Sequence, residues 1–231
     1  MPAVAPNLCA LPELAPLLRE ELERVSLEAM RRPSGRALLV QACADCRQTA
    51  VDAGRLVLVR QHLQAQRLTG AAHCDPRALP WEDAAFQLVV AQHVGDALGD
   101  SEPLVEELVR VLAPGGVILW FGFNPLSPWL ARMRWKTRGR VTPPQPLHAD
   151  RARQQLLRQH LAPAALDWLG PSWPLRVASA HLDTLVGPLR AAYLITATRE
   201  LVTPLALRRD RRREQVVIAP PLAVPSRRAC A

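Results

Sequence analysis

The sequence lacks long apolar runs, and its first residues show no basic start followed by an apolar block. A membrane-spanning helix needs about 18 consecutive, mostly apolar residues. Here Arg, Asp, Gln or Pro interrupts every candidate stretch. Residues 1–11 also do not have the pattern of a secretory signal. We therefore expect no membrane span, and the cytoplasm is the default location.

Lysine is almost missing: of 29 basic residues only Lys136 is a lysine. With the abundance of Ala, Leu and Pro, this indicates a compositional bias of the source genome. The net charge of +8 comes partly from the run Arg208–Arg213. Such a run can hold phosphates, but it is more often a solvated chain end, and no aromatic motif for base stacking accompanies it. The composition therefore argues against a nucleic-acid partner.

Cysteines are few and odd in number, five in all, so they do not form the framework of a disulfide-rich secreted domain. One alternative remains open. Cys43-x-x-Cys46 precedes a possible helix, and His73-Cys74 follows a neighbouring strand, so three sulfurs and an imidazole could bind zinc. A single CxxC without a second pair at finger spacing is common by chance, and we expect no metal.

The 231 residues fit one domain in which apolar runs alternate with helical patterns. This alternation predicts a mostly parallel sheet covered by helices on both faces. The predicted strands are 37–42, 56–59, 68–73, 86–91, 117–121, 175–180 and 192–198. The predicted helices are 12–31, 47–53, one that begins at Ser101 and ends before Pro114, and 150–160.

Three motifs lie close together between residues 75 and 117: Asp75-Pro76-Arg77, then Leu79-Pro80-Trp81, then Leu112-Ala113-Pro114-Gly115-Gly116. In this order they resemble the middle of a class I S-adenosylmethionine-dependent methyltransferase of the type 11 kind. The resemblance covers residues 36–200 and implies a Rossmann-like sheet of seven strands. It also implies S-adenosylmethionine as the cofactor.

Glycine is missing where the resemblance places the glycine-rich cofactor loop, which here reads Cys43-Ala44-Asp45-Cys46. A side chain at a position with positive φ costs about 1 kcal/mol and fills space that the ligand would use. At the end of the second strand, Arg60 stands where the family has a carboxylate for the ribose hydroxyls. Three interpretations stay open there. Arg60 could bind a phosphate in place of the ribose diol, Gln61 or His62 could form the hydrogen bonds to the ribose, or cofactor binding at this position is lost.

The resemblance implies which residues would contact the cofactor: Asp75, Cys43, Ala44, Ala91 and Gln92. Asp75 matches the acid that binds the adenine amino group, although it could equally cap its own turn. His93 is the candidate base, although a lone histidine is more often structural. Methyl transfer depends mainly on alignment of the two reactants, so a catalytic residue is not required.

We predict an N-terminal helical segment at 1–35, a methyltransferase-like domain at 36–200 and a basic, proline-containing tail at 201–231. A proline-rich lid or insertion is predicted at 124–147. The predicted function is methyl transfer from S-adenosylmethionine to a small-molecule or unknown acceptor, with cofactor binding impaired by the altered loop. The alternative is a catalytically inactive protein of the same fold that acts as a binding or scaffold module.

Overall fold

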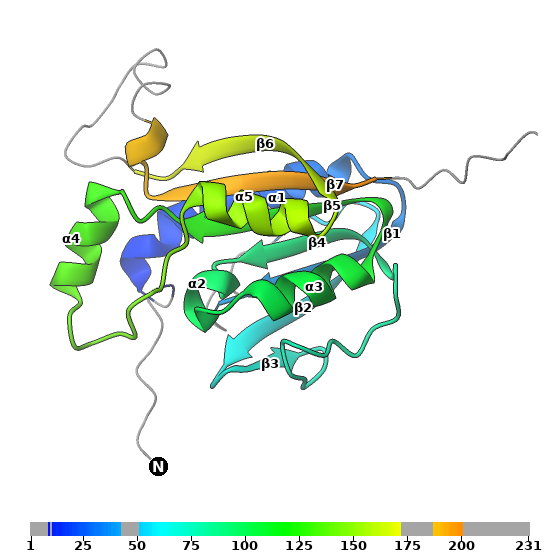
Figure 1. Cartoon of the computed structure of the whole chain (residues 1–231), viewed down its shortest axis with the longest axis horizontal. Helices are drawn as coiled ribbons and strands as arrows, with labels where there is room; N and C mark the ends of the chain where they lie inside the picture. The colour runs from blue at the N-terminus through cyan, green and yellow to red at the C-terminus, as the bar shows by residue number, and fades with distance from the viewer. Residues whose placement is uncertain (1–8, 10, 43–50, 172–186, 201–231) are drawn as a thin grey trace, which may run out of the picture. The chain divides into compact units, whose positions relative to one another are not determined.

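The structure is a computed structural model that describes residues 9, 11–42, 51–171 and 187–200. They lie in one compact unit, Met1–Leu201. Its strands are β1 Gly35–Gln41, β2 Leu56–Gln64, β3 Arg67–Gly70, β4 Phe86–Gln92, β5 Leu112–Phe123, β6 Leu161–Leu169 and β7 Ala192–Arg199 (Figure 1). Its helices are α1 Ala15–Met30, α2 Val94–Leu98, α3 Glu102–Val111, α4 Pro128–Lys136 and α5 Ala149–Arg158, with short 3-10 turns at Pro12–Leu14 and Gly187–Leu189.

These strands form one sheet in the order β3-β2-β1-β4-β5-β7-β6. The pairs β1–β2, β1–β4 and β4–β5 are parallel, and the pairs β2–β3, β5–β7 and β6–β7 are antiparallel. The chain starts at β1, winds outward to one side, then returns to β4 and winds to the other side. The predicted α/β Rossmann-like class is confirmed, and ligands of such sheets bind at the carboxyl ends of the strands near this reversal.

Strand β3 runs antiparallel to β2, which makes the sheet more mixed than predicted. Only Ala65 and Gln66 separate the two strands, and both have positive φ, 48° and 66°. A parallel neighbour would need a crossover of a dozen or more residues, whereas two such residues make a tight hairpin turn. The short connection therefore decides the direction of β3.

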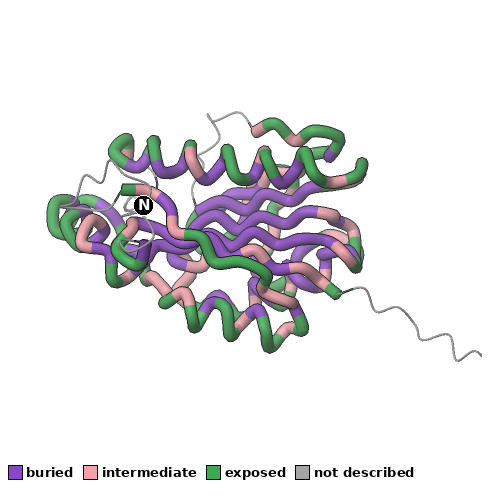
Figure 2. Tube along the Cα trace, turned by 90° about the horizontal axis from the view of Figure 1, so that it is seen from above, coloured by how far each residue is buried: buried purple, intermediate pink, exposed green. Residues whose placement is uncertain are grey.

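Helices cover both faces of the sheet, and Figure 2 shows the buried strands between them. On one face, Leu17, Leu22 and Val25 of α1 pack with alternate residues of β1, β4 and β5. On the other, α3 and α5 pack against the remaining strand positions. Helix α1, which belongs to the predicted segment 1–35, therefore shares a core with the strands of the sheet.

The end of the domain differs in detail from the prediction. The predicted strand 175–180 and the tail 201–231 lie outside the described residues, as does most of the predicted helix 47–53. Besides β5, the strand β7 pairs with β6 at Leu161–Leu169, a segment that was predicted as non-strand. Its middle residues are exposed, as suits an edge strand, so it lacks the apolar run that marks a buried one. Segment 124–147 is not wholly irregular, because it contains α4.

Candidate functional site

The carboxyl ends of β1, β4 and β5 meet at one edge of the sheet, and α1 covers them. Five polar side chains are buried there: Glu21 of α1, Gln41 of β1, Gln92 of β4, His93 directly after β4, and Asp96 of α2. We call them the edge network. Buried polar groups need hydrogen-bond partners, because each unpaired group costs about 1–3 kcal/mol of folding free energy.

The members of the edge network are hydrogen-bonded in a chain. The Gln41 amide Nε2 donates to Gln92 Oε1 at 2.8 Å, and Gln92 Nε2 donates to Glu21 Oε2 at 2.8 Å. The other Glu21 oxygen lies 2.8 Å from His93 Nε2. The side chains at this part of the edge are therefore bonded to one another.

His93 stands between two carboxylates, with Nε2 on Glu21 and Nδ1 3.1 Å from Asp96 Oδ2. Burial alone lowers the pKa of His93, but the two carboxylates outweigh burial and raise it to about 10. The backbone at His93 has φ 54°, and its ring stacks on Phe123 with centroids 3.9 Å apart. At neutral pH the imidazole is charged, so it cannot accept a proton from a substrate.

Asp96 ties segment 124–147 to the edge. Its carboxylate accepts hydrogen bonds from the backbone amides of Phe123, at 2.8 Å, and Leu147, while its backbone carbonyl accepts one from Gln145 at 2.8 Å. Burial raises the pKa of Asp96, against the opposing effect of these donors and His93. The predicted lid is thus attached to Asp96 through two hydrogen bonds, from the Gln145 and Leu147 amides.

Asp75 lies apart from the edge network, on the loop after β3. Cys74 pairs antiparallel with Leu68 of β3 through two backbone hydrogen bonds of 2.9 Å. Because β3 is itself antiparallel to β2, the chain reaches Asp75 in the same direction as β2. Asp75 Oδ1 accepts from the Arg77 amide at 2.9 Å, the turn contact that one interpretation predicted. The same exposed residue lines a cavity of about 240 Å³ with Gln66, Leu98 and Asp100, among others.

The comparisons with known proteins agree with this geometry. Residues 34–120 match the family model described as a methyltransferase domain. The strand order reverses between β1 and β4, and the last pair is antiparallel. The family match, over 87 of the 231 residues, confirms the resemblance to class I S-adenosylmethionine-dependent methyltransferases that the motifs at residues 75–117 predicted.

Solved structures of methyltransferase-family proteins share the fold. A protein from Bacillus halodurans assigned as a methyltransferase is 14% identical, with a TM-score of 0.53 over 78% of this chain and 98% of that one. A chain from the Haloferax volcanii complex of the Trm112 methyltransferase activator with its assigned methyltransferase is 12% identical. Its TM-score is 0.51 over 84% of this chain and 94% of the matched one. At such identities the likeness concerns the fold alone. No curated protein matches the sequence.

In this protein the end of β2 offers no carboxylate, because Arg60, Gln61 and His62 occupy three consecutive buried or half-buried positions near its end. The His62 ring lies 2.7 Å from the Thr69 hydroxyl. The Gln61 side chain is fully buried, and among the residues that the structure describes neither its Nε2 nor its Oε1 has a hydrogen-bond partner. The Gln61 amide is therefore an unsatisfied buried polar group, which is the kind of group that a bound ligand can satisfy.

The predicted site residues are divided by the structure. It brings Gln92 and His93 together at the edge and places Asp75 at the separate cavity. Ala91 is fully buried in β4, in the core beneath the edge. Cys43, Ala44 and Cys46 lie outside the described residues.

Glu21 is the site residue that the sequence reasoning missed. It lies on α1 with both carboxylate oxygens bonded, and it is fully buried. A signal was present, because Glu21 interrupts the apolar positions Leu14, Leu17, Leu18, Leu22 and Val25 of the predicted helix. A charged residue within an apolar stripe requires a buried partner.

In the described part of the chain, no three His, Cys, Asp or Glu side chains are grouped so that they could hold a metal ion. Cys74 is half-buried, and burial together with the neighbouring Asp75 raises the pKa of its thiol. None of the helices between residues 11 and 200 that the structure describes has the length and apolar character of a membrane span.

Proposed function

We propose that this protein binds S-adenosylmethionine at the carboxyl edge of its sheet and transfers the methyl group to an acceptor. The observation that carries the proposal is the cavity at Asp75. It lies where the segments that follow β3 and β4 approach each other in a sheet of this winding order.

Two described residues would hold the cofactor. Asp75 would accept a hydrogen bond from the adenine amino group through the carboxylate oxygen that the turn leaves available. The orphaned amide of Gln61 would bond a ribose hydroxyl in place of the missing carboxylate. When bound, the cofactor supplies an electrophilic methyl group on a sulfonium.

The edge network would position rather than catalyse. His93 is held as an imidazolium between Glu21 and Asp96, so it would fix α1 and the 124–147 segment around the acceptor. Displacement at the methyl group requires alignment of the nucleophile with the sulfonium, and a rigid edge provides alignment.

A second function is a binding or scaffold module without catalysis. Two observations favour it: no carboxylate ends β2, and the side chains of the edge network are bonded to one another. Under this alternative the cofactor does not bind, whereas the fold and the edge network stay intact.

Titration calorimetry of the full chain with S-adenosylhomocysteine and S-adenosylmethionine separates the two functions. Methyl transfer predicts saturable binding, weakened at least about tenfold by Asp75→Ala because one charged hydrogen bond contributes roughly 1.5–3 kcal/mol. No heat at millimolar ligand would contradict the enzyme and leave the scaffold.

Asp52→Ala is the matched control for this experiment. Asp52 makes the same kind of turn contact, because its Oδ1 accepts a hydrogen bond from the Gly54 amide at 2.9 Å, and it is also exposed. If both variants bind the ligand equally well, Asp75 serves only its own turn, and its role in the cofactor site is disproved.

A further inference from the structure

Helix α4 and the turn after it carry a concentrated positive charge. Residues 108–149 contain no Asp or Glu, and five basic residues fall within residues 132–140. Arg134, Arg138 and Arg140 are all exposed. Within the described residues these three arginines make no ion pair, whereas Lys136 lies 3.5 Å from Glu13.

Large apolar side chains are exposed beside these cations. The Trp135 side chain on α4 is 78% exposed, and Leu126, just before the helix, is 63% exposed. Leu189, 39% exposed, is held close to the start of α4, because its carbonyl accepts a hydrogen bond from the Ser127 hydroxyl at 3.2 Å. We call Leu126, Arg134, Trp135, Arg138 and Arg140 the α4 surface.

The α4 surface is presented by a firmly held helix. Leu130 and Met133 bury the inner side of α4 in the core, and the Ser127 hydroxyl accepts a hydrogen bond from the Leu130 amide at the helix start. The outward orientation of Trp135 follows from this anchoring. A cavity of about 370 Å³ opens beside it, lined by Arg134, Trp135, Arg138, Val141 and Pro143 among others.

We propose that the α4 surface docks this protein on an anionic phospholipid bilayer. Cations are attracted to the negative surface potential of such a membrane, and Trp prefers the boundary between headgroups and acyl chains. The cavity between Arg134 and Arg138 would take a lipid phosphate, with Trp135 beside it. Leu126 and Leu189 would enter the acyl boundary.

The exposed leucines favour a bilayer over a single-stranded nucleic acid. Single strands bind through cations and through aromatic rings on which bases stack, and aliphatic side chains contribute little to either contact. A bilayer uses cations, the indole and the leucines together. Because α4 follows the carboxyl end of β5 and lies beyond the strand ends in Figure 1, docking would place this edge of the sheet next to the membrane.

Flotation of the full chain with vesicles tests the proposal. Vesicles of phosphatidylcholine with about one third phosphatidylglycerol should bind the protein, and vesicles of phosphatidylcholine alone should not. Each cation near such a surface contributes about 1 kcal/mol, or roughly fivefold in partitioning. The variant R134S/R138S/R140S should therefore lose on the order of 100-fold, and Trp135→Ala at least about threefold.

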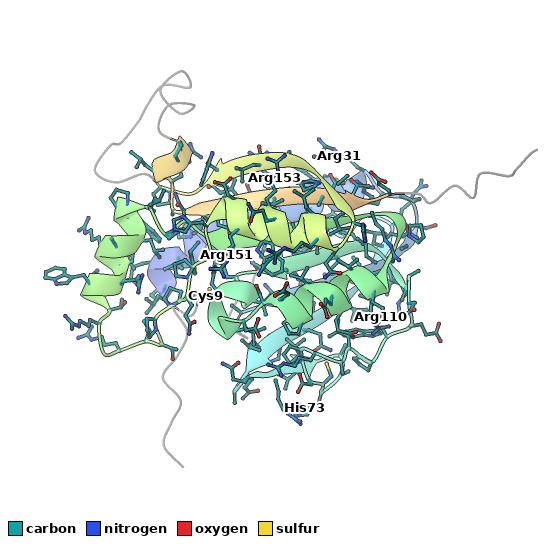
Figure 3. The ribbon with its side chains drawn as sticks, in the orientation of Figure 1. Cys9, Arg31, His73, Arg110, Arg151 and Arg153 are labelled. Carbon is teal, nitrogen blue, oxygen red and sulfur yellow. The ribbon has the colours of Figure 1, made fainter. Side chains whose placement is uncertain are left out.

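A matched control is R19S/R151S/R153S, which removes three exposed arginines from α1 and α5. Figure 3 labels Arg151 and Arg153, which lie on α5 and not on α4. This variant keeps the same net charge as the α4 variant, so its binding should change less than about twofold. Equal loss in both triple variants would show that net charge alone acts, and the proposal would fail.

Two further outcomes would overturn the proposal. If R208S/R209S/R211S abolishes vesicle binding while the α4 triple variant binds normally, the C-terminal arginines are responsible. If single-stranded RNA binds more tightly than anionic vesicles and the α4 variant loses it, the surface serves nucleic acid. All variants should melt like the parent chain, because the substituted residues of α4 are exposed.

Discussion

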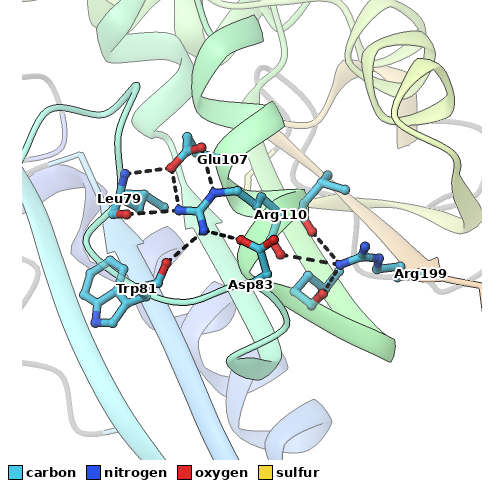
Figure 4. Close-up of polar contacts among 8 residues, drawn as sticks. Leu79, Trp81, Asp83, Glu107, Arg110 and Arg199 are labelled. Atoms are coloured by element: carbon cyan, nitrogen blue, oxygen red, sulfur yellow. Dashed lines mark hydrogen bonds and ion pairs between the residues drawn. The ribbon is translucent and has the colours of Figure 1, made fainter.

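Two polar clusters stabilise this protein at opposite ends of the central strands. The edge network lies at the carboxyl ends of the strands, and a second cluster lies around Arg110, where α3 leads into β5. In Figure 4 the Arg110 guanidinium contacts Glu107, Asp83 and the carbonyls of Leu79 and Trp81, at 2.6–3.0 Å. The Leu79 amide donates to Glu107 at 2.7 Å.

The two clusters differ in how far their side chains are buried and in which elements they connect. The Arg110 side chain is 32% exposed and Glu107 17% exposed, whereas the side chains of Glu21 and His93 are fully buried. The Arg110 cluster joins the Leu79-Pro80-Trp81 turn to α3, the helix that precedes the Pro-Gly-Gly motif. The motifs that carry the family resemblance therefore stabilise the fold in this protein. The edge network, by contrast, lies at the carboxyl ends of the strands, where ligands of such sheets bind.

The largest effect is expected from Glu21→Ala. It leaves the His93 imidazolium and the Gln92 amide buried without their partner, which costs about 3–5 kcal/mol of unfolding free energy. Urea denaturation measures the loss. Glu23→Ala on the exposed side of the same helix should change stability by less than about 0.5 kcal/mol. A loss below about 1 kcal/mol for Glu21→Ala would mean that the network is not formed.

Stability should also depend on pH through His93. Its pKa is about 10 in the folded chain and about 6.5 when unfolded, so the folded state binds the proton more tightly. The stabilisation is fully present below pH 6.5 and is lost as pH rises from there to about 10. We expect a fall of up to a few kcal/mol over this range.

Denaturation at several pH values between 6 and 10 checks this dependence. His93→Gln should remove the fall, and His148→Gln, at an exposed position before α5, should keep it. A parent chain equally stable at pH 6.5 and pH 9.5 would contradict a charged His93.

A smaller effect is expected at the opposite end of the strands. Arg110→Ala removes hydrogen bonds to two carbonyls and two carboxylates, but solvent reaches the cluster, so we expect a loss of about 1–3 kcal/mol. Arg158→Ala breaks the exposed pair with Glu102, and its effect should be under about 0.5 kcal/mol. If Arg110→Ala costs as much as Glu21→Ala, burial does not separate the clusters.

The smallest effect is expected for Asp75→Ala, because its turn contact is exposed. The loss should be at most about 1 kcal/mol and equal to that of Asp52→Ala, which removes the same kind of contact. Thermal melting of the two variants side by side measures it. A much larger loss at Asp75 would give that carboxylate a structural role beyond its turn.

Patterns within a few residues decided much of the fold. The apolar run of β4 marked a buried strand, and the order of Glu102 and Arg110 marked α3. The motifs at residues 75–117 identified the winding of the whole sheet. Asp75 was predicted either to contact adenine or to cap its turn, and the turn contact is present; the adenine contact stays a prediction.

Contacts between distant residues could not be predicted in this way. Glu21 and His93 are 72 positions apart, and their pairing requires α1 to lie over the carboxyl ends of β1 and β4. Strand β6 is stabilised by pairing with β7 and not by a buried apolar run. Local pattern thus decides whether a segment is a helix or a strand, because that choice depends on near neighbours. The partners of a buried charge depend on how the whole chain packs, and in this protein that packing brings Glu21 next to His93.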